Sequence, residues 1–169
     1  TTVICTDKTG TLTRGEFQMT RHLVLEPGLS EREFLETAVL ACERHPTDAM
    51  ERAIGAYADA RGGSSPDRES RWELVRDYDF DAIGKHMSHV WRSTDGEPTF
   101  VVAAKGAVEG VLAHTNLTAD ARSDILAANG QLAAQGLRVL VIAARHTAQL
   151  GTGREQDECN LAICGLLGF

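Results

Sequence analysis

The chain has 169 residues, which is room for one ordinary globular domain or for one domain with part of a second. Hydrophobic residues make up 43% of it and charged residues 24%, as in most globular proteins, and the net charge of -7 argues against nonspecific binding to nucleic acid, which requires a basic surface. The four cysteines form no C-x-x-C pair, and no apolar run is long enough to span a bilayer. These features predict a soluble, cytosolic chain with reduced thiols.

The first part of the chain predicts two strands followed by two helices. A β-branched run over 2–6 is typical of a buried strand, and weak alternation over 17–25 indicates a second strand. Ser30, with a Glu three residues later, forms a capping-box pattern at the start of one helix, and Pro46 lies in the first turn of the next. The Gly, Ser and Pro residues over 62–66 then predict a loop.

The rest of the chain predicts a sheet built mostly from hairpins. Its expected elements are strands over 72–80, 85–92, 99–104, 137–144 and 161–169 and helices over 106–113 and 118–135. Because most of these strands follow one another instead of alternating with helices, we predict an α+β fold, with an antiparallel twisted sheet flanked by helices. The strand over 2–6 is expected to belong to a different unit.

The motif that carries chemistry is DKTGTLT, residues 7–13. It places the carboxylate of Asp7 at the carboxyl end of a buried strand, before a loop whose backbone N–H groups can hold phosphate oxygens. A carboxylate in that position can attack a phosphoryl group and form an acyl phosphate. Thr9 stands where a second Asp could act as general acid and base, so we expect the phosphorylated intermediate to be long-lived.

This heptad resembles the phosphorylation motif of the P-type ATPases, a branch of the haloacid dehalogenase superfamily. The resemblance implies that ATP is the substrate, that Asp7 is the catalytic nucleophile and that Mg2+ bridges the nucleotide to it. It also implies that Asp7 and Thr9 hold Mg2+ in the complete enzyme, Thr9 through its backbone carbonyl. The overall pattern favours the calcium- or magnesium-pump-like branches of the family.

Two later segments resemble the family's adenine-binding motifs. In the second predicted helix, Asp48 resembles the acidic residue that faces the adenine amino group. On the following strands, Phe80 resembles the ring that stacks on adenine, and Lys85 and Met87 resemble the side chains that line the same pocket. The family often has an Arg two residues after this ring. The chain has Ala82 there, which on a continuous strand would share the face of Phe80.

Two further segments complete the resemblance. The sequence AKGAVEGVL, residues 104–112, is similar to the family's Lys-Gly-Ala-Pro-Glu pattern, with Val108 in place of Pro. This similarity implies that Lys105 lies deep in the ATP pocket and that Gly106 lets the backbone approach the purine. Arg138, in the segment GLRVL, resembles the family's Arg that contacts the phosphates.

The resemblance also implies a domain organisation. Residues 1–15 would be a stub of an α/β phosphorylation domain, residues 16–160 the nucleotide-binding domain, and residues 161–169 the strand that returns toward the phosphorylation domain. We expect both ends to be cuts through a pump on the cytosolic face of the cell membrane. Its remaining phosphorylation, actuator and transmembrane domains would be this chain's partners, and without them the chain is expected to bind ATP without turnover.

Other functions remain open at this point. A haloacid-dehalogenase-type phosphatase would require a second Asp where Thr9 stands, and a regulatory module could bind a nucleotide or a protein without any chemistry. The dipeptide at 45–46, His-Pro, is also found in heavy-metal pumps, although those lack the motifs around Phe80. His86 and His89 are expected on opposite faces of a strand, which makes them a poor pair of metal ligands.

Overall fold

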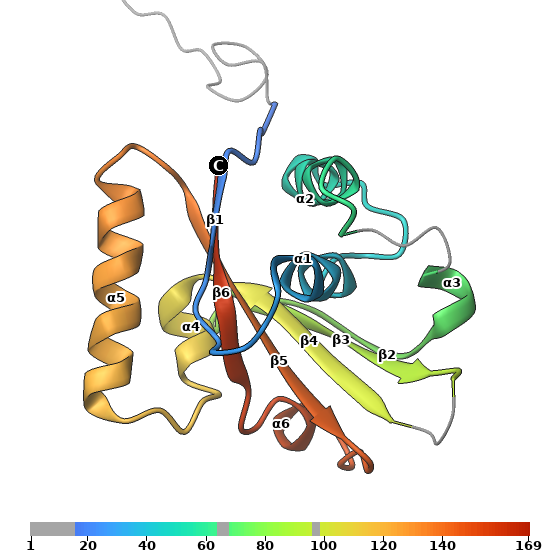
Figure 1. The fold of residues 1–169 in the computed structure, drawn as a ribbon. Coiled ribbons are helices and arrows are strands. Elements are labelled where there is room, and N and C mark those ends of the chain that lie inside the picture. The colour runs from blue at the N-terminus through green and yellow to red at the C-terminus, as the bar shows by residue number, and fades with distance from the viewer. Residues whose placement is uncertain (1–15, 64–67, 96–98) are drawn as a thin grey trace, which may run out of the picture.

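The computed structural model in Figure 1 describes residues 16–63, 68–95 and 99–169. Its centre is a six-stranded antiparallel sheet with the strand order β1-β6-β5-β4-β3-β2. The strands are β1 (Arg21–Val24), β2 (Trp72–Asp81), β3 (His86–Ser93), β4 (Phe100–Gly106), β5 (Val139–Thr147) and β6 (Ala162–Gly168). This architecture confirms the predicted α+β class. The strand predicted over 2–6 lies outside the described residues.

The helices lie on both faces of the sheet, with α1 and α2 over one face and α4 and α5 over the other (Figure 1). Their bounds are α1 (Glu31–Leu40), α2 (Ala49–Asp59), α3 (Arg68–Arg71), α4 (Val108–Leu112), α5 (Ala119–Ala133) and α6 (Arg154–Asp157). The predicted capping box is present at the start of α1. The Ser30 backbone N–H donates to Glu33 Oε2 at 3.0 Å, and the Glu33 backbone N–H donates to Ser30 Oγ at 3.3 Å.

Strand alternation divides the interior into two hydrophobic cores. On β3, Trp91 packs in the core with α1 and α2, whereas its neighbour Val90 packs in the core with α4 and α5. The same alternation places Val101 and Val102 of β4 in different cores. His86 and His89 accordingly face opposite sides of the sheet, as predicted, with His86 bonded to Glu158 and His89 near Asp77.

The last strand, β6, lies inside the sheet, between the edge strand β1 and β5. Its residue Leu166 is fully buried and pairs with Leu23 of β1 on one side and with Val141 of β5 on the other. The residues predicted to return toward a phosphorylation domain therefore first form an internal strand. Because β1 and β6 come from opposite ends of the sequence, this pairing also brings the two ends of the described chain together.

The connection between β2 and β3 departs from regular strand geometry. Tyr78 pairs with Ser88, but the register shifts before Asp81 pairs with His86. The strand ends at Asp81, whose carboxylate accepts a hydrogen bond from the Ile83 backbone N–H at 2.9 Å. The expectation that Ala82 shares the face of Phe80 is therefore wrong, because it required a continuous strand across this position.

Candidate functional site

A cavity of about 390 Å3 lies where the start of α2, the end of β2 and the strands β3, β4 and β5 meet. Six of the seven residues predicted to bind ATP contribute to its lining, and Lys85 does not. The complete lining consists of Glu43, Thr47, Asp48, Met50, Glu51, Phe80, Met87, Lys105, Gly106, Arg138 and Leu140.

Lys105 is a buried charged residue of this cavity. The residue is 6% exposed, and its ammonium donates to Glu51 Oε1 and to the Ala41 carbonyl oxygen, both at 2.6 Å. The pairing of β3 with β4 sets Met87 directly opposite Lys105, and the Met87 Sδ lies 2.9 Å from the ammonium. A buried ammonium needs such partners, because an unpaired charge is costly to remove from water.

Glu51 is a site residue that the sequence analysis missed. It lies in the first turn of α2, is 4% exposed and binds Lys105 with one carboxylate oxygen only. The other oxygen, Oε2, is buried and has no hydrogen-bond partner among the described residues. Buried polar atoms are nearly always paired, so this oxygen, on a residue that lines the cavity, is a candidate acceptor for a ligand's N–H group. Its position three residues after Asp48 on a predicted helix was the available signal.

Asp48 caps the helix that begins at the wall of the cavity. It is the N-cap of α2, where its Oδ1 accepts hydrogen bonds from the backbone N–H groups of Met50 at 2.8 Å and Glu51 at 3.2 Å. An aspartate in this position satisfies free N–H groups and interacts favourably with the helix dipole. Asp48 lines the cavity, but it acts on the start of the helix that carries Glu51.

Phe80 lies at the rim of the cavity and is 60% exposed. If β2 alternated regularly, Phe80 would share a face of the sheet with Tyr78. That face is the one opposite the cavity, where the Tyr78 hydroxyl donates to Asp157. The register shift between Tyr78 and Asp81 turns Phe80 toward Met87 and Lys105 instead. A large aromatic ring left this exposed is not a core residue, and it is free to stack on a planar ligand.

Gly106 and Lys85 meet at the turn that closes one side of the site. A Cβ on Gly106 would lie 2.4 Å from the Lys85 carbonyl oxygen, so only glycine allows this approach. Lys85 has a positive φ of 53°, and its carbonyl accepts from the Ala107 backbone N–H at 2.9 Å. Its exposed side chain lines a different cavity, beside Ile83. The Lys85 side chain thus lies outside the cavity that the other predicted residues line.

Arg138 lines the cavity from the segment just before β5 and is exposed. Two backbone hydrogen bonds with Phe169, at 3.0 and 2.9 Å, fix its position beside the sheet. Its guanidinium lies 5.9 Å from the centroid of the Phe17 ring. An exposed guanidinium at the mouth of a cavity can reach a phosphate, for which its planar fork is well matched. Asp7 and Thr9, predicted to carry the chemistry and the Mg2+, lie outside the described residues.

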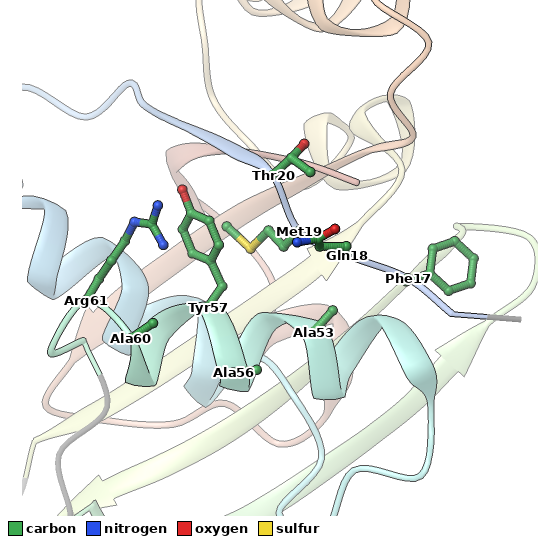
Figure 2. A pocket seen from close by; sticks show the side chains of 9 residues that line it. All are labelled: Phe17, Gln18, Met19, Thr20, Ala53, Ala56, Tyr57, Ala60 and Arg61. Atoms are coloured by element: carbon green, nitrogen blue, oxygen red, sulfur yellow. The ribbon is translucent and has the colours of Figure 1, made fainter. Parts of the chain in front are cut away.

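Two other cavities differ from this one in chemistry. Figure 2 shows one of about 480 Å3, between α2 and the segment over 17–20, where the Arg61 guanidinium lies 3.6 Å from the centroid of the Tyr57 ring. Of the described residues that line it, none is predicted to bind ATP. The third, of about 590 Å3, contains Lys85 and lies beside the buried pair His86 and Glu158.

The buried pair is part of a polar network on the α4 and α5 side of the sheet, in which both Glu158 oxygens have partners. Glu158 accepts from Ser88 at 2.7 Å and from Arg154 at 3.0 Å, and it lies 3.0 Å from His86 Nε2. Burial raises the pKa of Glu158, but hydrogen bonds from His86, Arg154 and Ser88 outweigh it and lower the pKa to about 2. The bond to Glu158 raises the pKa of His86. This network joins the segment after α6 to β3.

The sheet, the helices on its two faces and the cavity form an α+β domain, and the comparison of sequences identifies its family. The chain belongs to the family of P-type ATPase cytoplasmic N domains, whose family profile matches residues 43–169. Within the described residues, the structure contains no helix that is both long and apolar enough to cross a membrane.

Individual relatives match over nearly the whole chain. It is 30% identical to the magnesium-transporting ATPase, P-type 1, of Salmonella typhimurium, across 99% of the chain and 20% of that relative. It is 27% and 28% identical to the plasma membrane ATPase of Zygosaccharomyces rouxii and plasma membrane ATPase 1 of Saccharomyces cerevisiae, each across 98% of the chain and 17% of the relative. The chain therefore spans about a fifth of the length of these relatives.

Proposed function

We propose that this chain is the ATP-binding part of a cation-transporting P-type ATPase and that the cavity around Lys105 holds the adenine end of ATP. The observation that carries the proposal is that one cavity is lined both by an exposed ring, Phe80, and by a buried carboxylate with one unpaired oxygen, Glu51. Adenine offers both a flat π-face and an amino group. We propose the magnesium- or calcium-pump-like branch, for which the name of one relative, a magnesium-transporting ATPase, gives support, whereas the other two are named only as plasma membrane ATPases.

The residues have distinct tasks in this proposal. Phe80 stacks on the purine, which is worth roughly 1–3 kcal/mol. Glu51 accepts from the adenine amino group, Lys105 orients Glu51 through their ion pair, and Gly106 leaves room for the base. Arg138 lies at the mouth of the cavity, where it contacts the phosphates. Asp48 supports the site by capping α2, so we propose Glu51 as the acidic residue that recognises adenine.

In the complete pump, the Asp7 carboxylate attacks the γ-phosphorus and the bond to the leaving ADP oxygen breaks, which leaves an aspartyl phosphate. Mg2+, held by Asp7 and Thr9, would neutralise phosphate charge during this step. We propose residues 1–15 as a stub of the phosphorylation domain, 16–160 as the nucleotide-binding domain and 161–169 as the return segment. The partners are the remaining phosphorylation, actuator and transmembrane domains, on the cytosolic face of the cell membrane. The family match does not favour a separate phosphatase.

An NMR titration of the isolated chain with ATP and AMP tests the proposal. We expect weak binding, with Kd in the range of roughly 0.1 to several mM, because few phosphate contacts are present. Backbone signals of Phe80, Met87 and Lys105 should shift, AMP should compete, and no sustained phosphate release should occur. Asp7→Asn should leave the affinity unchanged. Shifts confined to the Tyr57 cavity of Figure 2, or none at several mM ATP, would overturn the proposal.

A further inference from the structure

A second cluster of ionisable side chains lies beside the nucleotide cavity. His89 of β3 pairs across the sheet with Asp77 of β2, and Glu43 approaches from the segment after α1. His89 Nε2 lies 3.3 Å from Asp77 Oδ1 and 3.7 Å from Glu43 Oε2. One ligand atom from each residue lies within 4.8 Å of the others. These three groups therefore converge on a single point.

The imidazole of His89 is the unusual member of this cluster. Its side chain is 0% exposed, yet neither Nδ1 nor Nε2 has a hydrogen-bond partner among the described residues. Buried polar atoms without a partner are rare and require an explanation. Burial, and then the charge of Lys105, lower the pKa of His89, which favours the neutral imidazole. The neutral imidazole is the form that binds metal ions.

The spacing and the charges both fit a metal ion. Ligands bound at about 2.0–2.2 Å in tetrahedral geometry lie roughly 3.3–3.6 Å apart, close to the two distances from His89 Nε2. The charged groups that act on His89 are the carboxylates of Glu43, Asp77 and Glu51 and the ammonium of Lys105. With neutral His89 their formal sum is -2, so one divalent cation would balance it.

A comparable cluster on the other face of the sheet is not suited to a metal. His86, His114 and Glu158 also bring their ligand atoms within 4.8 Å of one another. However, Arg154 donates to both Glu158 oxygens at 3.0 Å and its guanidinium lies 3.3 Å from His86 Nε2. A guanidinium already supplies the positive charge there. Asp77 and Glu43 have no such cation on them in the described part of the chain, and their side chains are 41% and 36% exposed, which leaves a path for an ion.

We propose that Glu43, Asp77 and His89 form a binding site for one divalent zinc-class cation, with His89 Nε2 and one oxygen from each carboxylate as ligands. Water would complete a four-coordinate shell. An imidazole nitrogen selects Zn2+ over Mg2+, which prefers a shell of oxygens. This site is separate from the Mg2+ that accompanies ATP, and it forms without a nucleotide.

Calorimetric titration of the intact chain with Zn2+, in excess Mg2+ and with thiols alkylated, tests this site. We expect one Zn2+ per chain and a change in the NMR signal of His89 Nε2. Asp77→Asn and Glu43→Gln should each lower the affinity for Zn2+ at least about tenfold, since even the loss of a residue that only hydrogen-bonds to a metal ligand costs about that much. Asp79→Asn, the same charge change two residues along β2, is the matched control and should bind Zn2+ as the unmodified chain does.

Three results would overturn the proposal. The first is an equal loss in Asp79→Asn and Asp77→Asn, which would indicate a diffuse acidic surface. The second is displacement of Zn2+ by Mg2+, which would mean that the imidazole takes no part. The third is no Zn2+ binding once the thiols are alkylated. Asp77 and Glu43 are partly exposed, so these variants test the site without removing the buried imidazole.

Discussion

The two faces of the sheet each bury a glutamate, and the two glutamates are satisfied to different extents. Glu158 has partners on both oxygens from three side chains, whereas Glu51 has Lys105 on one oxygen and no described partner on the other. The first arrangement resists any ligand and stabilises the fold. The second leaves hydrogen-bonding capacity beside a cavity. Burial of a charged group therefore indicates a binding site only when its partners are incomplete.

The largest effect is expected from removing the saturated glutamate. Glu158→Ala leaves His86 and Arg154 without their shared carboxylate and should reduce the free energy of unfolding by about 3–5 kcal/mol. Urea denaturation measures this loss. Glu155→Ala, an exposed neighbour in α6, should change the stability by less than about 0.5 kcal/mol. Similar stability of the two variants would show that the network does not hold the fold.

The stabilisation that the network around Glu158 provides should be lost both at low pH and at high pH. The pKa of Glu158 is about 2 in the fold against a reference of 4.5, so its contribution is complete above about pH 4.5 and is lost as pH falls toward 2. The pKa of His86 is raised above 6.5, so its contribution is complete below pH 6.5 and is lost as pH rises through the raised value. Stability measured by urea denaturation should therefore peak between these limits.

Glu158→Ala provides the control for this pH profile, because it removes both the Glu158 carboxyl and the partner that raises the pKa of His86. The decline in stability on either side of the peak should be smaller in the variant than in the unmodified chain. Parallel profiles would mean that other groups set the dependence on pH.

On the other face of the sheet, the preference for adenine over another base should show whether Glu51 or Asp48 recognises the base. If Glu51 Oε2 accepts from the adenine amino group, the chain should bind ATP more tightly than ITP, which carries an oxygen in place of that amino group. The preference should be at least about tenfold, since a hydrogen bond to a charged group is worth roughly 1.5–3 kcal/mol. Glu51→Gln should remove most of this preference in a nucleotide titration. Asp48→Asn keeps a good N-cap residue and should retain the preference. Loss of selectivity in Asp48→Asn alone would reverse this assignment.

The smallest effect is expected at Ala82, which lies in the turn after β2 and is not part of the cavity lining. Ala82→Arg would restore the residue common in the family. Because the new guanidinium would be exposed and outside the cavity, it should change the affinity for ATP by less than about twofold, which corresponds to at most about 0.5 kcal/mol. A clear gain for ATP without a gain for AMP would show that the turn can bring position 82 to the phosphates.

Local patterns in the sequence predicted the elements well, and long-range geometry accounts for what they missed. Ser30 and its Glu partner mark a helix start because a capping box is a local interaction. Phe80 reaches the cavity only because the pairing of β2 with β3 shifts in register. The alternation of residues within β2 does not reveal such a shift. The exclusion of Lys85 depends on a positive φ and on close approach to Gly106, and the role of Glu51 depends on Lys105, a residue distant in sequence.

The central claim is that the cavity beside Glu51 binds the purine and that the Phe80 ring stacks on it. A pair of variants tests this claim most directly. Phe80→Ala and Ile83→Ala each remove an exposed apolar side chain near the same turn, 60% and 94% exposed respectively, but only Phe80 lines the cavity. Phe80→Ala should weaken ATP binding by about 1–3 kcal/mol with the melting temperature preserved, and Ile83→Ala should change neither. Equal ATP affinity in the two variants, or a melting temperature that falls in Phe80→Ala while binding stays intact, would contradict the account.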